Sequence, residues 1–162
     1  MAVTSGSQPF GLWVVTVSWQ GDEVYRVHFG RTGPAGPVHP LIRRFLMGHE
    51  VDLSPIHSPA EEGDGVTAAI YRAVKGVGYG EVATYGEIAE RVGTSPRAVG
   101  QAMARNPTPL VIPCHRIVSK QGIGGFTPPI EIKRDLLAME RAACRQKRAR
   151  TSLGEPGQAE GS

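Results

Sequence analysis

The most constraining feature of the sequence is a set of helix start and stop signals within residues 84–107. Thr84 and Glu87 have the spacing of a capping box, in which the two side chains satisfy free N–H groups of the first turn. Gly93 is suited to end that helix, and Ser95, followed directly by a proline, is suited to start a second one. Two short helices joined by a glycine-containing turn predict a helix-turn-helix.

The second of these helices, over residues 96–105, has an unusual composition. Its inner positions are apolar, and its outer face would carry Arg97, Gln101, Ala104 and Arg105. Ala98 and Gly100 keep the helix narrow, so that its arginines could approach a nucleic-acid duplex closely, even in the minor groove. An ordinary surface helix with a tolerated glycine explains the same residues, and the spacing alone does not decide between these two interpretations.

A polar stretch rich in proline and glycine, residues 54–65, divides the sequence into two parts. Before it, residues 12–19 and 24–29 are rich in β-branched and aromatic side chains around a turn, which predicts a β-hairpin. A short helix is expected over residues 38–47. After it, apolar residues recur at helical spacing from Val66, which predicts a further helix.

These patterns predict an α/β (α+β) fold. We expect a small N-terminal subdomain with a β-hairpin, a helix and the linker at residues 1–62. A mostly helical domain with a winged helix-turn-helix-like unit is expected at residues 63–142, and a basic, then polar, disordered tail at residues 143–162.

The net charge of +3 hides an uneven distribution. Residues 1–65 hold four arginines against seven acidic side chains, and residues 66–140 hold nine basic against six acidic ones. Residues 141–150 hold five basic side chains and no acidic one. A basic half is typical of proteins that contact phosphate, although a solvated charged surface explains it equally well.

Several classes of protein are disfavoured by the composition. No apolar run approaches the roughly 18 residues of a membrane span. The two cysteines, Cys114 and Cys144, are too few for a disulfide framework, and no CxxC pair suggests zinc. His39, His49 and His57 lack metal-like spacing and are expected at the surface. The first ten residues have no signal-peptide pattern, so we expect the protein in a reducing cytoplasm. We also expect no metal and no cofactor.

A reactive centre is suggested by the segment PLVIPCHRIV at residues 109–118. It places the Cys114 thiol at the end of an apolar run, beside an imidazole and a guanidinium. A thiolate is a strong nucleophile, and a neighbouring base or cation favours its formation. Adjacent side chains on an extended chain point in opposite directions, so contact with His115 needs a turn or a bridging water. A buried structural cysteine is the simpler alternative.

The longer pattern resembles the O6-alkylguanine-DNA alkyltransferases, also called methylated-DNA–protein-cysteine methyltransferases. The resemblance rests on GEVATYGEIA, RAVGQAMARN, NPTPLVIPCHRIV and GGFTPPIEIKRDLLAME, in that order, within about residues 66–140. It implies direct reversal of DNA damage: an irreversible transfer of a methyl or other alkyl group from O6 of guanine, with O4 of thymine as a second target, to Cys114. Each protein molecule would act once.

The resemblance also assigns roles to the residues around the thiol. His115 would deprotonate Cys114 through a water molecule, and Glu140 would orient and polarise that histidine, as in a triad. Asn106 would brace the turn that carries the cysteine. Tyr85 would press on the phosphate of the target nucleotide, support its rotation out of the duplex, and donate a proton to the departing purine.

DNA contacts are implied in the same way. Arg97 matches the arginine that enters the base stack and fills the space of the rotated base. Backbone contacts or local support are implied for Thr67, Gly86, Gln101 and Arg116. The substrate pocket would be formed by Phe126, Thr127, Pro128 and Ile117. Two consecutive prolines should stiffen its loop, because they lack N–H donors and have a fixed φ. We therefore expect a narrow pocket that favours methyl over bulkier groups.

Three other functions remain open at this point. One is a sensor that binds alkylated bases without accepting the group, and a second is a helix-turn-helix regulator that does no chemistry. The third is a cysteine hydrolase. The expected partner is double-stranded DNA carrying O6-alkylguanine, with no membrane contact. We expect a monomer located in the cytoplasm, at the nucleoid.

Overall fold

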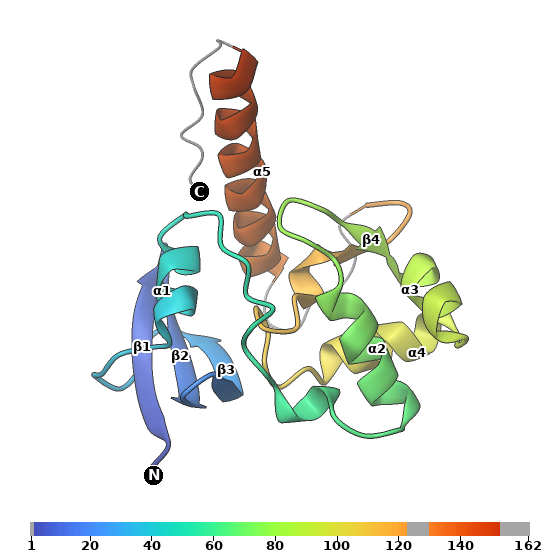
Figure 1. Cartoon of the computed structure of the whole chain (residues 1–162), viewed down its shortest axis with the longest axis horizontal. Coiled ribbons are helices and arrows are strands. Elements are labelled where there is room, and N and C mark those ends of the chain that lie inside the picture. The colour runs from blue at the N-terminus through green and yellow to red at the C-terminus, as the bar shows by residue number, and fades with distance from the viewer. Residues whose placement is uncertain (1, 123–129, 153–162) are drawn as a thin grey trace.

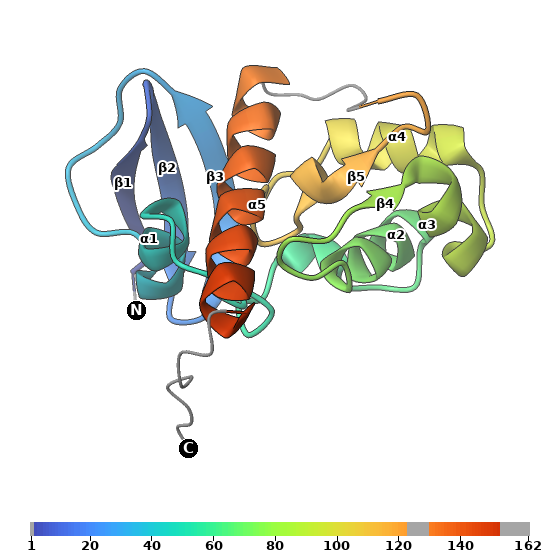
Figure 2. The same ribbon diagram turned by 90° about the horizontal axis from the view of Figure 1, so that it is seen from above.

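The computed structural model describes residues 2–122 and 130–152. An antiparallel sheet with one helix forms one lobe, three short helices form the other, and a long C-terminal helix runs between them (Figures 1 and 2). The expected mixed fold is confirmed. Among the described residues, no helix has the length and apolar character needed to cross a membrane.

The sheet has one strand more than the sequence predicts. Its order is β1 (Thr4–Phe10), β2 (Trp13–Gln20) and β3 (Glu23–Gly30), all antiparallel. The β2–β3 hairpin is the expected one, and the side chains of Val15 and Val17 on β2 are fully buried. The sequence of β1 contains glycine, serine and proline, which have low β-propensity. Its pairing with β2 along its whole length, rather than its own composition, makes it a strand.

Helix α1 (Pro40–Leu46) covers this sheet and lies within the expected range. Its N-cap is His39, whose Nδ1 accepts a hydrogen bond from the backbone N–H of Leu41 (3.1 Å). The other ring nitrogen lies 2.8 Å from the carboxylate of Asp22. The expectation of a surface histidine is therefore wrong at residue 39, which is buried because it caps the helix and packs beside Trp19.

The second lobe contains α2 (Val66–Lys75), α3 (Tyr85–Val92) and α4 (Pro96–Ala104), and a short 3-10 helix, η1 (Pro59–Glu61), lies in the linker before it. The expected capping box is present, with Thr84 and Glu87 bonding each other's backbone N–H at 3.0 and 2.7 Å. Gly93 ends α3 at φ +86°, and Ser95 caps α4. The predicted helix-turn-helix is confirmed, with the outer positions of α4 exposed.

Two very short strands connect this unit to the cysteine segment. β4 (Ala83–Thr84) pairs in parallel with β5 (Ile117–Val118). β4 leads directly into α3, and β5 directly follows the 3-10 helix η2 (Cys114–Arg116). The pairing therefore brings the start of α3 beside the segment that contains the thiol.

The long helix α5 (Ile130–Ser152) completes the core. Ile132 and Leu136 join the apolar cluster of the sheet, together with Leu110 and Val111 from the cysteine segment. The helix continues to Ser152, so residues 143–152 do not form the disordered tail that was expected. Their alanine- and arginine-rich sequence has high helix propensity, which explains the continuation.

Candidate active site

Cys114 lies at the end of a buried turn that is closed by a backbone bond from Ile112 N–H to the Thr108 carbonyl (3.0 Å) and braced by the side chain of Asn106. Asn106 donates from Nδ2 to the carbonyl of Ile112 (2.8 Å) and accepts from the N–H of Thr108 (3.0 Å). Between them, Leu110 adopts φ +79°, a left-handed conformation that is costly for a branched side chain. Asn106 thus spans the turn from both sides, as expected of a residue that braces the cysteine.

Burial controls the resting state of the thiol. Only 2% of Cys114 is exposed, and burial raises its pKa to about 11, although a hydrogen bond with Asn106 and the charge of Lys133 act in the opposite direction. The thiol is therefore protonated at neutral pH. A base must remove its proton before the sulfur can act as a nucleophile.

The neighbouring imidazole is held by a carboxylate. The 3-10 turn of η2 directs His115 toward α5, where its Nε2 donates to Oε2 of Glu140 (2.7 Å). Its Nδ1 is buried and has no hydrogen-bond partner within residues 2–122 and 130–152. The Cys114 thiol and the His115 ring therefore make no direct hydrogen bond, and the basic nitrogen of the ring is the one that remains available.

Glu140 accepts hydrogen bonds from three directions. Besides His115, it accepts from Nε and Nη2 of Arg116 (2.9–3.2 Å) and from the backbone N–H of Gly80 (3.0 Å). Burial alone would raise the pKa of Glu140, but the bonds and charges of His115 and Arg116 outweigh it and lower the pKa to about 2. Burial lowers the pKa of His115. The network is thus an anionic carboxylate, a guanidinium cation and a neutral imidazole.

Arg116 acts within this network rather than at the surface. It is buried, and its remaining nitrogen donates to the carbonyl of Val77 (2.9 Å). Of the two roles expected for it, local support fits the structure and contact with the DNA backbone does not, because all its donors point inward.

Lys133 belongs to the site but was not singled out from the sequence. It is 0% exposed, its Nζ donates to the carbonyl of Ile117 (2.6 Å), and it lies 5.9 Å from the centre of the Tyr85 ring. Burial lowers its pKa to about 8, while the Cys114 sulfur acts to raise it. The available signal was its position seven residues before Glu140, which places both side chains on the same, inward face of the helix.

Tyr85 lies near the thiol, with the centre of its ring 5.9 Å from Nζ of Lys133. It is half-buried at the start of α3, and burial together with the nearby Cys114 sulfur raises its pKa. A groove of about 490 Å³ passes over it, lined by residues of α3, α4 and the loop after β5, among them Tyr85, Gly86, Arg97, Gly100, Ser119 and Lys120. The structure therefore brings Arg97 and Gly86 to one groove with Tyr85.

The remaining expected residues are dispersed. Thr67 and Gln101 are exposed on α2 and α4 and do not line this groove. Ile117 is buried at the start of β5. Phe126, Thr127 and Pro128 lie outside the described residues, so the pocket loop and its narrowness stay predictions.

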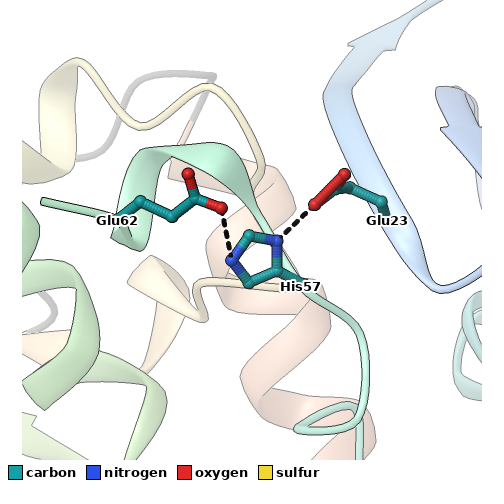
Figure 3. Close-up of side chains that lie close together, drawn as sticks. All are labelled: Glu23, His57 and Glu62. Atoms are coloured by element: carbon teal, nitrogen blue, oxygen red, sulfur yellow. Dashed lines mark hydrogen bonds and ion pairs between the residues drawn. The ribbon is translucent and has the colours of Figure 1, made fainter.

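A second group of titratable side chains joins the sheet to the linker (Figure 3). His57 is half-buried, and its two ring nitrogens face the carboxylates of Glu23 and Glu62, the second at 3.2 Å. Its backbone also pairs with β3, through bonds to Asp22 and Val24 at 2.8 and 2.9 Å. Since the carboxylates lie on opposite sides of one ring, the group is arranged as an ion-pair link. The absence of a metal stays a prediction.

Comparison with known proteins agrees with this arrangement. Residues 66–142 match the family model described as the DNA-binding domain of 6-O-methylguanine DNA methyltransferase. A methylated-DNA–protein-cysteine methyltransferase of Metallosphaera sedula is 55% identical over 71 residues, 44% of this chain and 46% of that protein. One of Methanocaldococcus vulcanius is 41% identical over 106 residues, 65% of this chain and 60% of that protein. The chain thus matches about half the length of these curated relatives.

Solved structures extend the likeness to most of the chain. The O6-methylguanine-DNA methyltransferase of Pyrococcus kodakaraensis strain KOD1 has a TM-score of 0.66 and 27% identity, covering 86% of this chain and 99% of that one. The Mycobacterium tuberculosis OGT in complex with DNA has the same fold, with a TM-score of 0.69 at 23% identity over 86% and 93% of the two chains. Residues 66–142 are therefore similar to the DNA-binding domain of 6-O-methylguanine DNA methyltransferase, in a chain with the fold of the O6-methylguanine-DNA methyltransferases.

Proposed function

We propose that this protein repairs DNA by transferring a methyl or other alkyl group from O6 of guanine in double-stranded DNA to Sγ of Cys114. The observation that carries the proposal is the His115 ring next to Cys114 in the chain, which is bound through Nε2 to Glu140 and whose buried Nδ1 has no hydrogen-bond partner among the described residues. A buried thiol of high pKa needs such a base at the moment of attack.

The reaction balances without a cofactor. His115 Nδ1 takes the thiol proton through one water molecule, and the thiolate attacks the alkyl carbon. The carbon–sulfur bond forms as the carbon–O6 bond breaks, and the electron pair of the broken bond stays on guanine. The proton then passes to the departing base, with Tyr85 as donor and His115 as the source that restores it. The stable thioether makes the transfer irreversible, so each molecule acts once.

The charges around His115 are suited to this step. Burial lowers the pKa of His115 and keeps the imidazole neutral and able to accept a proton, and the charge of Arg116, which is paired with Glu140, acts in the same direction. When His115 becomes an imidazolium, Glu140 is already ionised and already hydrogen-bonded to it. The carboxylate thus stabilises charge that develops during the reaction, without any need to reorganise.

Lys133 supplies a second electrostatic contribution. Its Nζ is fixed by the carbonyl of Ile117, three residues after the reactive sulfur. A cation held there lowers the free energy of the thiolate relative to the thiol. This contribution partly offsets the burial that raises the pKa of Cys114.

The helix-turn-helix supplies the DNA contacts. The target O6 is inaccessible within a duplex, so the nucleotide must rotate out. Tyr85 and Arg97 line one groove, and this arrangement supports a role for Tyr85 against the phosphate of the target and for Arg97 in the vacated stack. Contacts by Gly86, Thr67 and Gln101 with the backbone of the flanking nucleotides complete the proposal. We also expect a monomer in the cytoplasm, at the nucleoid.

Intact mass measures the transfer directly. After incubation with a duplex that contains O6-methylguanine, the protein should gain the mass of one methyl group and no more. Cys114→Ser should gain none, whereas Cys144→Ser, the matched control at the other cysteine, should gain the full amount. DNA binding without a mass gain would instead identify a sensor or a regulator. Repeated turnover of an acyl substrate would identify a hydrolase.

A further inference from the structure

We propose that the outer face of α5 is a second contact surface for the phosphate backbone of double-stranded DNA, separate from the groove at α3 and α4. This inference rests on DNA being the partner in the proposed function. It concerns an arginine stripe on α5, which we define as Arg134, Arg141, Arg145 and Arg148.

The four arginines share one direction on the helix. At 100° per residue they fall within an arc of roughly 60°, and at 1.5 Å per residue they extend over about 21 Å. All four are exposed. The buried residues of the same helix, from Ile132 to Glu140, centre on a direction about 120° away. The stripe therefore faces solvent while the other side of α5 anchors the helix to both lobes.

The helix packs against the rest of the protein up to the middle of the stripe. Cys144 packs directly on Gly80, where a Cβ would lie 2.5 Å from the sulfur. Beyond that contact, α5 projects from the body of the molecule, and in both views its C-terminal end is the part farthest from α4 (Figures 1 and 2). A duplex lying along the stripe would therefore be a different stretch of DNA from that held at Arg97.

The charges of the stripe lack protein partners. Within residues 2–122 and 130–152, none of the four guanidinium groups forms an ion pair or a hydrogen bond. Arg141, Arg145 and Arg148 instead repeat at spacings of four and three residues, where like charges repel and destabilise a helix. An ordinary solvated helix would place acidic residues at those spacings, but residues 141–152 contain none.

A nucleic-acid backbone fits this surface by charge and by geometry. Duplex DNA carries one negative charge per about 1.7 Å of its axis, so a 21 Å stripe faces several phosphates. Arginine binds phosphate with two parallel hydrogen bonds, which lysine cannot do. Contacts of this type position a protein on DNA without reading its sequence.

The chain offers a matched pair of charge variants on one helix. Arg141→Gln with Arg145→Gln removes two charges of the stripe. Lys147→Gln with Arg150→Gln removes two exposed basic charges that lie at least about 100° from the stripe, one of which, Lys147, forms an exposed 3.7 Å ion pair with Glu50. Glutamine keeps helix propensity close to that of arginine and lysine, so both variants should retain α5.

The test is the salt dependence of binding to an unmodified duplex of about 30 base pairs. Between about 50 and about 200 mM salt, loss of two phosphate contacts should lower the slope of log K against log salt by about 2 in the stripe variant. The control variant should change it by less than about 0.5. An unchanged slope in the stripe variant, or equal changes in both variants, would overturn the proposal.

Two further measurements distinguish DNA contact by the stripe from the proposed methyl transfer and from binding to a membrane surface. Methyl transfer from a saturating short methylated duplex should be complete in the stripe variant, because Cys114 and the groove at α3 and α4 are unchanged. If the protein without substitutions gains no mass, the proposed methyl transfer is refuted. The salt slopes would still show whether the arginine stripe contacts DNA. Release from phosphatidylserine vesicles by the stripe variant, with no change in its DNA slope, would identify a membrane surface and refute DNA as the partner.

Discussion

His115 and Glu140 are joined by a 2.7 Å hydrogen bond, each residue is about 1% exposed, and the bond links the turn that contains Cys114 to the C-terminal helix. A bond of this kind fixes which ring nitrogen carries the proton. Because Nε2 is committed to the carboxylate, Nδ1 is the nitrogen that can accept the proton of Cys114.

The first prediction concerns the charge of this carboxylate. Glu140→Gln keeps the shape of the side chain but removes the anion that stabilises imidazolium, so the single-turnover rate of methyl transfer should fall by roughly 100-fold. The substitution also leaves the guanidinium of Arg116 buried without its partner, which should lower the free energy of unfolding by about 3 kcal/mol. Rapid-quench transfer and urea unfolding measure the two effects. An unchanged rate would exclude Glu140 from catalysis.

Stability should depend on pH through the same network. The pKa of Glu140 is lowered from 4.5 to about 2 in the folded protein, so the unfolded chain binds its proton first on acidification. The contribution of this group is fully present above about pH 4.5 and is lost as the pH falls toward 2, amounting to about 3 kcal/mol. Burial also lowers the pKa of His115, so the free energy of unfolding falls further as the pH drops below about 6.5. Urea unfolding between pH 7 and pH 3 should show both losses, and Glu140→Gln should remove the lower one.

Lys133 should control the reactivity of Cys114 independently of DNA. In a Cys144→Ser background, which leaves one thiol, Lys133→Met should slow alkylation by iodoacetamide near pH 7 by about tenfold, because Lys133 is charged there and loss of the cation raises the thiol pKa by about one unit. Lys133→Arg should restore most of the rate. Lys120→Met, at an exposed lysine of the groove, is the control and should have little effect. Equal alkylation rates in the two methionine variants would show that Lys133 does not control the reactivity of Cys114.

The ion-pair link at His57 should contribute modestly to stability. His57→Gln removes the contacts with Glu23 and Glu62, and since both partners are partly exposed, the loss in the free energy of unfolding should be about 1 kcal/mol. The loss should shrink at high salt, where exposed charges are screened. His49→Gln, at an exposed histidine, should change nothing. A salt-independent loss would show that packing, rather than charge, joins the sheet to the linker.

Local signals predicted the helix-turn-helix well. The pairs Thr84–Glu87 and Ser95–Ala98 are satisfied within one turn of helix, so neighbouring residues alone determine them. β1 and the cap formed by His39 depend instead on partners far along the chain, which the sequence does not reveal. Because Glu140 and Lys133 lie on one helix face, the sequence pattern could predict that both point inward. The spacing of residues along the sequence could not show that the side chain of Arg116 would also bind Glu140.

The last prediction concerns Gly80, whose backbone N–H holds Glu140. This residue adopts φ +79°, and a Cβ there would lie 2.5 Å from the sulfur of Cys144. Gly80→Ala should therefore cost both the strain of the left-handed conformation and a displacement of α5, in total about 3 kcal/mol of unfolding free energy. Gly93→Ala is the matched control, since Gly93 has φ +86° and open space around it. It should cost only about 1 kcal/mol.

If displacement of α5 is the cause of the difference, Cys144→Ala should recover part of the loss in the Gly80 variant and none in the Gly93 variant. Equal losses in the two alanine variants would show that Cys144 does not fix the position of the helix that carries Glu140.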